Sequence, residues 1–353
     1  MRLIVTGGGT GGHVFPALEI ARLARDRGHE VLYWGSLRGQ ERAISEREGF
    51  PFRGFPSEPL YSLKSVRGWR AALNLLRARR MVVPALRRVE ADAVFSTGGY
   101  SAGPVVAAAM KLGVPYVMHA ADAIPARSIT LFARRAFAVT TVFKAAADRL
   151  PGARVERTGM PIRRELREAA AAPRERHGNQ ILVTGGSQGS AFLNSQTPKA
   201  ARLLSRPDLT WNHVSGPTHF EAVSQTSAGI SGYQVRPFLA GNLMAEAYQS
   251  ADLVLCRSGG SLAEVALFGL PSVLVPFPSA AADHQTANAQ EFVAMGAATL
   301  HPERSSTPEG LAADLMAWID DPARRVAAAN ATAQFDIPDA AERIIALVEE
   351  AAR

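Results

Sequence analysis

The chain has 353 residues, of which 47% are hydrophobic and 20% are charged. This length and balance predict a globular protein of two domains with large cores. The single cysteine, Cys256, excludes a disulfide framework within the chain and favours a reducing compartment. Beside an apolar strand, it is expected to be a small buried residue. No apolar run is long enough to span a membrane, and the N-terminus enters a predicted strand at once, without a signal peptide.

The net charge of +7 favours anionic partners. Basic residues concentrate in residues 67–88, with apolar residues between them. They are Arg67, Arg70, Arg77, Arg79, Arg80, Arg87 and Arg88, interleaved with Trp69, Leu73, Leu75, Leu76, Met81 and Val82. This pattern predicts either a basic helix that rests on an anionic membrane surface or a surface helix with its apolar side in the core. The chain has no recognisable nucleic-acid-binding module, so we expect no nucleic-acid partner.

Short apolar strands alternate with helices through the first half of the chain. The predicted strands are 2–6, 31–35, 93–97, 115–119, 138–142 and 155–158. The predicted helices are 14–27, 38–48, 69–89, 103–112, 127–135 and 144–150. This alternation predicts a parallel sheet covered by helices on both faces, with ligands at the carboxyl ends of its strands.

The stretch after the first strand, residues 7–13, combines a glycine cluster with a histidine. Three of its glycines have the Gly-x-Gly-x-x-Gly spacing of a dinucleotide-binding loop, where a ligand approaches the backbone and an anion meets a helix start. The second strand runs into Ser36 without the carboxylate that would hold the ribose of NAD, so the loop geometry is favoured and NAD is not. His13 is a candidate proton acceptor. The alternative is a glycine turn that only packs a helix on a strand.

Two further turns lie at predicted strand ends in this half. Residues 96–104 repeat the strand-to-glycine pattern, and residues 119–122 follow the next strand. In a doubly wound sheet, both turns would share one crevice with residues 7–13. Asp122 is either a polar group of that site or the cap of the helix that follows, and its residue type favours the cap.

The chain changes character at residues 159–179, where a turn leads into a charged, alanine-rich stretch. Residues 180–190 then echo the first strand, because both apolar runs end in Thr-Gly-Gly. We therefore predict two similar doubly wound domains, 1–160 and 161–335, with a C-terminal helix in 336–353 that can return to the first domain. Further strands are expected near 210–214, 233–236, 252–256, 272–276 and 297–300.

Two stretches of the second half carry polar groups after predicted strands. Residues 256–264 open a helix, whose N–H groups could hold a diphosphate while Glu264 accepts from two ribose hydroxyls. The alternative for Glu264 is stabilisation of the positive helix end. In residues 282–288, Gln285 and Asn288 could read sugar hydroxyls or be solvated surface amides.

Four stretches in order, over nearly the whole chain, resemble the MurG family of bacterial N-acetylglucosamine transferases. They are residues 8–16, 98–104, 185–189 and 283–289. The resemblance implies the α/β glycosyltransferase-B fold, with two Rossmann-like doubly wound domains and an interdomain cleft. It implies transfer from UDP-N-acetylglucosamine, bound mainly by the second domain, to lipid I, the undecaprenyl-diphosphate-linked acceptor, bound by the first. The product would be lipid II, made by a peripheral enzyme on the cytoplasmic face of the bacterial inner membrane.

The same resemblance carries functional residues over by position. On the first domain they are Thr10, Gly11 and Gly12 at the donor sugar and acceptor diphosphate, and Tyr100 and Asp122 as further substrate-binding residues. Arg163, just after the predicted boundary, should contact the nucleotide. On the second they are Ser187 and Gln188 at the phosphates, Phe238 and Leu239 at the uracil, Arg257, Ser258, Gly259, Gly260, Ser261, Leu262 and Glu264 around diphosphate and ribose, and Gln285 and Asn288 at the sugar.

The chain departs from the family pattern at three places. Where the family has His-Glu-Gln-Asn, residues 119–122 read His-Ala-Ala-Asp, which removes two polar side chains from the acceptor side. The loop 257–264 is one residue shorter than usual. The stretch between Phe238 and Met244 is two residues longer.

We hypothesise an inverting displacement, in which an acceptor hydroxyl attacks the anomeric carbon as UDP leaves. His13 is the candidate base, and Asp122 is the second candidate. Loop N–H groups and helix starts of the second domain would stabilise the departing diphosphate, with no cofactor and no obligatory metal. The alternatives are another sugar transferase of the same fold, an NAD-dependent oxidoreductase and a non-enzymatic membrane-binding module.

Overall fold

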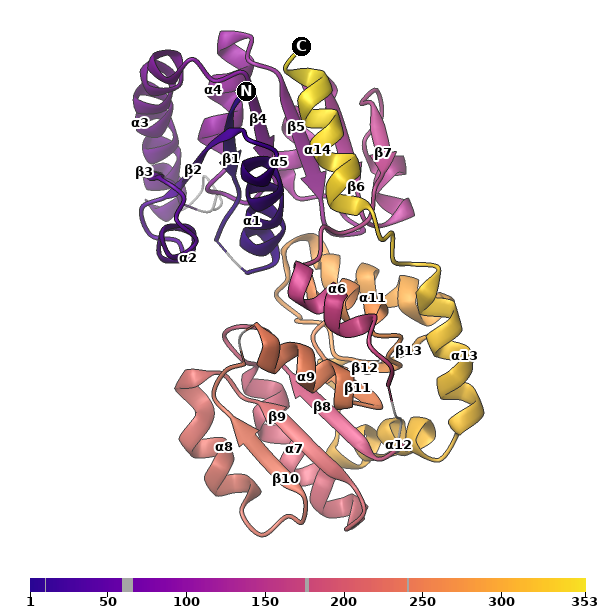
Figure 1. Cartoon of the computed structure of the whole chain (residues 1–353). Coiled ribbons are helices and arrows are strands. Elements are labelled where there is room, and N and C mark those ends of the chain that lie inside the picture. Colours follow the sequence, from indigo (N-terminus) through magenta and orange to yellow (C-terminus); the bar gives the residue numbers. More distant parts are fainter. Residues whose placement is uncertain (10, 59–65, 175–177, 240) are drawn as a thin grey trace. The chain divides into compact units, whose positions relative to one another are not determined.

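The computed structural model describes residues 1–9, 11–58, 66–174, 178–239 and 241–353. These residues form two compact units (Figure 1). Unit 1 comprises residues 1–163 together with 337–353, and unit 2 comprises residues 164–336. The sequence analysis had placed the two boundaries after residues 160 and 335. The C-terminal segment packs with the N-terminal part of the chain, so the last helix belongs to unit 1.

Unit 1 is built on a sheet of seven parallel strands in the order β3-β2-β1-β4-β5-β6-β7. The strands are β1 (Arg2–Thr6), β2 (Glu30–Ser36), β3 (Phe52–Phe55), β4 (Ala93–Ser96), β5 (Tyr116–Ala120), β6 (Ala138–Thr141) and β7 (Val155–Arg157). The six predicted strands are confirmed. The edge strand β3 was not predicted, because Arg53 and Gly54 break its apolar pattern.

The helices of unit 1 lie on both faces of this sheet. They are α1 (Gly11–Asp26), α2 (Glu41–Arg47), α3 (Val66–Val89), α4 (Gly103–Leu112), α5 (Arg127–Phe132) and α14 (Ala340–Ala351), with 3₁₀ turns η1 (Ala133–Arg135) and η2 (Lys144–Arg149). The helix predicted over 144–150 is present as the 3₁₀ helix Lys144–Arg149. Pro151 restricts the residue before it and stops a longer helix from forming.

The core of unit 1 has two halves, one on each face of the sheet. Successive residues of β1 point to opposite faces: Ile4 packs with Val82 and Leu86 of α3, whereas Leu3 and Val5 pack on the side of α1 and α14. Helix α14 lies beside α1 (Figure 1) and buries Ile344, Ile345 and Val348 there. Without this helix, an apolar face of the sheet would be exposed to water.

Unit 2 repeats the arrangement with six parallel strands in the order β10-β9-β8-β11-β12-β13. The strands are β8 (Gln180–Thr184), β9 (Thr210–Val214), β10 (Tyr233–Arg236), β11 (Leu253–Cys256), β12 (Ser272–Leu274) and β13 (Ala298–Leu300). The helices are α6 (Arg164–Ala170), α7 (Ala191–Leu204), α8 (Phe220–Ser227), α9 (Asn242–Ser250), α10 (Ser261–Leu267), α11 (His284–Ala294), α12 (Pro308–Ile319) and α13 (Pro322–Ala333), with 3₁₀ turns η3 (Pro217–His219), η4 (Ala281–Asp283) and η5 (Glu303–Ser305).

Both units therefore place their first strand in the middle of a doubly wound sheet, which confirms the predicted fold class. β1 lies between β2 and β4, and β8 lies between β9 and β11. The chain order reverses at these strands, and ligands bind beyond the carboxyl ends of strands at such points. Cys256, at the end of β11, is fully buried, and burial raises the pKa of its thiol to about 12, as expected of an inert core residue.

Candidate active site

The loop after β1 leads directly into α1. This helix begins at Gly11, three residues before the predicted start, so that Gly11, Gly12 and His13 form its first turn. The first N–H groups of a helix have no acceptor within it, and the helix dipole makes this end favourable for an anion. The predicted ligand contact of Thr10 lies outside the described residues. His13 is half-buried at this helix end.

The two glycine loops of unit 1, predicted to share one crevice, are in direct contact. Thr97, which follows β4, donates from its hydroxyl to the carbonyl oxygen of His13 over 2.7 Å. A Cβ atom on Gly99 would lie 2.5 Å from the carbonyl oxygen of Gly8, so only glycine allows this approach. The ring of Tyr100 covers Gly9 in the same way, with Cε1 only 2.6 Å from where a Cβ would stand. Loop 96–104 thus supports the turn that carries His13.

The third predicted turn of unit 1 contributes a buried histidine. His119, at the end of β5, is fully buried, and its Nδ1 lies 2.9 Å from the hydroxyl oxygen of Thr140. Burial, and then the nearby charge of a protonated His13, lower the pKa of His119 to about 3. His119 therefore stays neutral near pH 7 and is a poor proton acceptor.

Asp122 is half-buried and lies in the bend that follows β5. The interpretation of Asp122 as a helix cap is wrong, because α5 begins at Arg127 and its cap position is Ala126, without a side-chain hydrogen bond. An alanine occupies the cap because the chain reaches the helix in an extended conformation through Pro125. The interpretation as a polar site group stays a prediction.

Arg163, the last residue of the first segment of unit 1, stacks on α1. Its guanidinium carbon lies 4.9 Å from the centre of the Phe15 ring, a cation–π arrangement. Phe15 is two residues after His13 on the same helix. The predicted contact of Arg163 with a nucleotide stays a prediction, and its observed role is to contact the helix that carries His13.

A carboxylate does reach the end of β2, contrary to the reasoning applied to the sequence. Glu41, the first residue of α2, is fully buried and accepts hydrogen bonds from the backbone N–H groups of Ser36, over 2.8 Å, and Gly9, over 3.3 Å. This carboxylate is used by the protein's own backbone and has no exposed surface for a ribose. The absence of an exposed acid at this position, rather than the absence of any acid, argues against NAD.

In unit 2, the loop after β8 is an open turn. Ser187 and Gln188 occupy the turn, and Gly186 has a φ of +83° with no atom within 4 Å of where a Cβ would stand. Ser190 caps α7 by accepting from the N–H of Leu193 over 3.3 Å. Within this turn, the N–H groups of Gly186 and Gly189 bond to Thr184 Oγ1 and to the carbonyl oxygen of Gly186. The predicted phosphate contacts of Ser187 and Gln188, at the solvent-accessible turn before α7, stay predictions.

The loop after β11 is fastened to α11 by side chains from both. Ser258 donates from its hydroxyl to the carbonyl oxygen of Gln285 over 2.8 Å, and Asn288 donates from Nδ2 to the carbonyl oxygen of Ser258 over 3.0 Å. Asn288 is fully buried, so its interpretation as a solvated surface amide is wrong. Gln285 accepts from the N–H of Phe277 over 2.9 Å through Oε1. The predicted contacts of both amides with a sugar stay predictions.

Arg257 is held by the body of unit 2. Its Nη1 donates to the carbonyl oxygens of Val275 and Pro276 and lies 2.5 Å from a carboxylate oxygen of Glu303. This pairing fixes the start of the loop that continues through Gly259 and Gly260 to Ser261, the first residue of α10. The side chain of Leu262 is buried in the core, so only its backbone is available to a ligand.

Glu264, one turn into α10, has a buried partner that the sequence analysis missed. The hydroxyl of Tyr248 on α9 donates to Oε2 of Glu264 over 3.0 Å. Tyr248 is itself fully buried and stacks on Phe268, with ring centres 5.2 Å apart. A tyrosine sixteen residues before the glutamate gives no local signal in the sequence, because α9 and α10 meet only through the fold.

Residues 238–239 follow β10 and differ in exposure. Phe238 is 46% exposed, whereas Leu239 is buried. An exposed aromatic ring at a strand's carboxyl end suits the predicted contact with a base, which remains a prediction. Residue 240 lies outside the described part of the chain.

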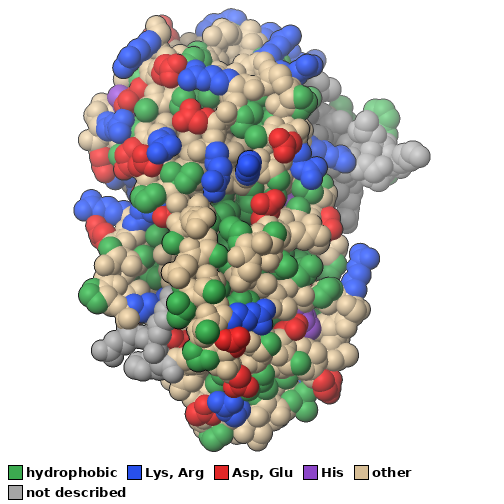
Figure 2. Space-filling model, turned by 90° about the vertical axis from the view of Figure 1, so that its right-hand side faces the viewer, with side chains coloured by type: hydrophobic (Ala, Val, Ile, Leu, Met, Phe, Trp, Pro, Cys, Tyr) green, Lys and Arg blue, Asp and Glu red, His purple; other side chains and the backbone are tan. Residues whose placement is uncertain are grey.

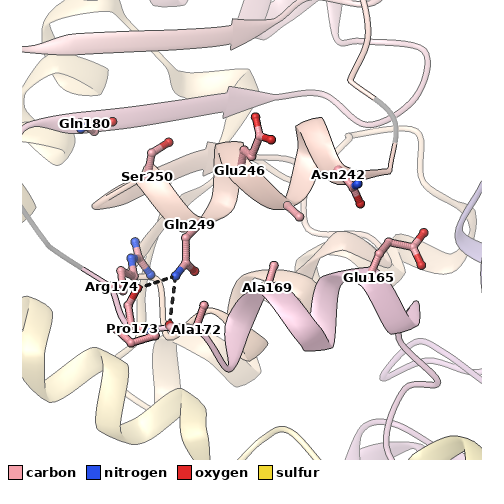
Figure 3. A pocket seen from close by; sticks show the side chains of 11 residues that line it. Glu165, Ala169, Ala172, Pro173, Arg174, Gln180, Asn242, Glu246, Gln249 and Ser250 are labelled. Atoms are coloured by element: carbon pink, nitrogen blue, oxygen red, sulfur yellow. Dashed lines mark hydrogen bonds between the residues drawn. The ribbon is translucent and has the colours of Figure 1, made fainter.

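A cavity of about 520 Å³ lies between α6 and α9, away from these residues (Figure 3). It is lined by Glu165, Ala169, Ala172, Pro173, Arg174, Gln180, Asn242, Ala245, Glu246, Gln249 and Ser250. Gln249 donates to the carbonyl oxygens of Ala172 and Pro173 across it. None of the predicted site residues lines this cavity, and it extends to Gln180, the first residue of β8, at the amino end of that strand.

The fold and these strand-end loops define a class of enzyme. The chain matches the glycosyltransferase family 28 N-terminal domain over residues 3–141 and the glycosyltransferase family 28 C-terminal domain over residues 180–344. The two matches correspond to the two sheets.

Within that class, relatives of similar length match the chain from end to end. A UDP-N-acetylglucosamine–N-acetylmuramyl-(pentapeptide) pyrophosphoryl-undecaprenol N-acetylglucosamine transferase of Solibacter usitatus is 38% identical over 99% of this chain and 96% of its own. The enzyme of the same name from Anaeromyxobacter sp. strain Fw109-5 is 37% identical over 100% of this chain and 94% of its own. The crystal structure of Acinetobacter baumannii MurG is 28% identical, with a TM-score of 0.79 over 99% of both chains. The chain belongs to the MurG family of glycosyltransferases.

Proposed function

We propose that the chain transfers N-acetylglucosamine from UDP-N-acetylglucosamine to lipid I and so makes lipid II for peptidoglycan. The full-length match to relatives named for this reaction carries the proposal. The two units divide the work: the strand-end loops of unit 1 take the acceptor, and those of unit 2 take the donor.

The acceptor hydroxyl attacks the anomeric carbon of the donor, and the bond from that carbon to UDP breaks. His13 takes the hydroxyl proton, because it stands at the first turn of α1, held by Thr97 and by the packed glycine loops. Asp122, half-buried after β5, is the second candidate for the base.

The donor meets two loops of unit 2. The turn of Ser187 and Gln188 and the start of α7 offer N–H groups to the diphosphate, whose negative charge grows as the sugar leaves. Glu264, oriented by Tyr248, accepts from the ribose hydroxyls, and Phe238 presents its exposed ring to the uracil. Gln285 and Asn288 fix the loop that approaches the sugar. The backbone donors act without a cofactor, and we expect no metal requirement.

Unit 1 docks on an anionic membrane surface through α3. On one side of this helix, Ala78, Val82 and Leu86 enter the core. On the opposite side, Trp69 is 64% exposed and Leu73 is 52% exposed, among arginines and without one acidic residue between Val66 and Val89. The face of the molecule in Figure 2, by contrast, shows acidic and basic side chains interspersed. An exposed Trp and Leu on an arginine-rich helix, of which Arg70 pairs with Glu58, suit the headgroup region of anionic lipid.

With this docking, the chain would be a peripheral enzyme on the cytoplasmic face of the inner membrane. No helix within the described residues combines the length and the apolarity needed to cross a bilayer. The same positive charge would also attract nucleic acid, but exposed apolar side chains on α3 favour lipid.

The proposal is tested by transfer of labelled N-acetylglucosamine from its UDP donor to a short-chain lipid I analogue, with and without a chelator. We expect lipid II analogue as product, at the same rate with the chelator. No transfer to lipid I, but transfer to another lipid or to a natural-product acceptor, would contradict the proposed acceptor. A rate abolished by the chelator would contradict the metal-free mechanism.

A further inference from the structure

The buried carboxylate of Glu41 is the least expected polar group in unit 1. Glu41 comes from the first turn of α2, yet it is fully buried and folds back under the loop that follows β1. Its Oε1 accepts from the N–H of Ser36 over 2.8 Å, and its Oε2 accepts from the N–H of Gly9 over 3.3 Å. Each oxygen thus satisfies one backbone donor, and the two donors belong to the ends of two neighbouring strands.

Three glycines form the space that this carboxylate occupies. A Cβ on Gly8 would lie 2.4 Å from the carboxyl carbon of Glu41, and one on Gly35 would lie 2.6 Å from its Cγ. A Cβ on Gly39 would lie 1.8 Å from Oε2. Any side chain at these positions would displace the carboxylate, so the loops after β1 and β2 are shaped around Glu41.

Two further side chains hold the same loop at other points. The hydroxyl of Tyr33 donates to the carbonyl oxygen of Gly7 over 2.5 Å, and Thr97 donates to the carbonyl oxygen of His13. Burial, and then the charge of Glu41, raise the pKa of Tyr33 well above its usual range, so this phenol keeps the proton that it donates. Glu41 is the one of the three that fixes the loop by an N–H group, at Gly9.

We propose that Glu41 is a positioning residue that fixes the Gly9 end of the loop between β1 and His13 for the acceptor. The inference rests on the proposed function, because it assigns this loop to acceptor binding and to the proton transfer at His13. A carboxylate is needed because both of its oxygens accept. An amide would turn an N–H group toward one of two N–H donors and leave that donor unsatisfied.

The test compares Glu41→Gln with Glu46→Gln in the full chain. Glu46 lies on the same helix but is exposed, and it pairs with Arg42 four residues before it. We expect Glu41→Gln to lower kcat/KM for a lipid I analogue by roughly tenfold to a hundredfold, with part of the loss in the acceptor KM, because a displaced loop misplaces the reacting groups. The KM for UDP-N-acetylglucosamine should stay within about twofold, and Glu46→Gln should match the wild type.

These readouts separate positioning from a fold defect. A partly unfolded protein would lose kcat at an unchanged acceptor KM, so that result, or a Glu41→Gln enzyme indistinguishable from Glu46→Gln, would overturn the proposal. If Glu41→Gln does not fold, Gly39→Ala takes its place, since it keeps the carboxylate and pushes it aside. The same rise in acceptor KM is expected. A wild-type chain with no transfer to lipid I would instead refute the proposed function itself.

Discussion

The two glycine loops that begin the two units start from the same sequence pattern and end in different environments. After β1, the loop is held by Tyr33, Glu41 and Thr97, and Tyr100 covers it. After β8, the hydroxyl of Thr184 accepts from the N–H of Gly186 over 3.2 Å, and the loop packs closely on neighbouring backbone: a Cβ on Gly189 would lie 1.9 Å from the carbonyl oxygen of Ser215. In the first loop a backbone donor is already satisfied by a carboxylate, whereas the second presents an open turn.

The difference indicates that the Thr-Gly-Gly pattern specifies a strand-to-helix turn but not the ligand. A nucleotide diphosphate needs N–H groups that can donate to it, and we propose that the turn of Ser187 and Gln188 before α7 provides them. The loop of unit 1 instead leads to His13, whose carbonyl oxygen accepts from Thr97. We therefore propose that the donor binds at the second loop, and that the acceptor binds at the first, where its proton is taken.

The largest effect should come from His13→Ala, which tests the first loop. Loss of a general base lowers turnover by about 10²–10⁴-fold. Because the donor binds at the other loop, its affinity should hold within about twofold. Initial rates and calorimetric titration with UDP measure the two quantities. Turnover near the wild-type value would remove His13 from the base role and leave Asp122.

A smaller effect is expected from substitutions on α3 of unit 1, the helix proposed to bind the membrane. Trp69→Ser and Leu73→Ser should each weaken binding to anionic liposomes by roughly tenfold, since each removes an exposed apolar side chain that lipid would cover. Transfer to a water-soluble acceptor should not change. Leu203→Ser on α7 is the matched control, because Leu203 is 52% exposed, as is Leu73, but lies on unit 2. Equal losses for the Leu73 and Leu203 variants in liposome flotation would contradict docking through α3.

Tyr248→Phe tests the donor side with a smaller change. Loss of one hydroxyl that orients Glu264 should raise the KM for UDP-N-acetylglucosamine by roughly twofold to tenfold, with the acceptor KM unaltered. Tyr233→Phe is the control, since its hydroxyl also has a buried partner in unit 2, His213, but lies away from the loops. In steady-state kinetics, combining Tyr248→Phe with Glu264→Gln should be no worse than Glu264→Gln alone. Additive losses would mean that Tyr248 acts on the donor by another route.

The smallest expected effect is on the pH dependence of the free energy of unfolding. The two units are alike here, because each contains a buried histidine with a lowered pKa. In each unit, burial lowers the pKa of a histidine near a strand end: that of His119 to about 3 and that of His213 from 6.5 to about 4. As the pH falls, the unfolded chain protonates these histidines before the folded chain does. Their contribution to the free energy of unfolding is therefore complete above pH 6.5 and decreases as the pH falls toward 4, by up to about 1.4 kcal/mol per pH unit for each histidine.

His213→Gln should flatten the pH dependence of unit 2 across this window. Urea denaturation at about pH 7 and about pH 5 measures it. The variant loses the hydrogen bonds to Tyr233 and Asn194 at both pH values. The quantity to compare is therefore the difference between the free energies of unfolding at the two pH values. An unchanged difference would show that His213 is not the titrating group.

The sequence was sufficient to predict the parallel strands, because most of them are continuous apolar runs. It was also sufficient to predict two domains, because each begins with such a strand. It was insufficient where a residue acts across the fold. Glu41 lies five residues beyond the end of β2, and nothing local shows that its side chain turns back to Gly9. Tyr248 meets Glu264 only because α9 and α10 pack together. The edge strand β3 was missed because it lacks an apolar pattern.

The central claim is that UDP binds at the second glycine loop and not at the first. Amide hydrogen exchange with and without UDP tests it directly, because backbone N–H groups that hold a diphosphate exchange more slowly. We expect slower exchange in residues 186–192 and 258–264, with residues 7–13 unchanged. Slower exchange confined to residues 7–13 would contradict this assignment.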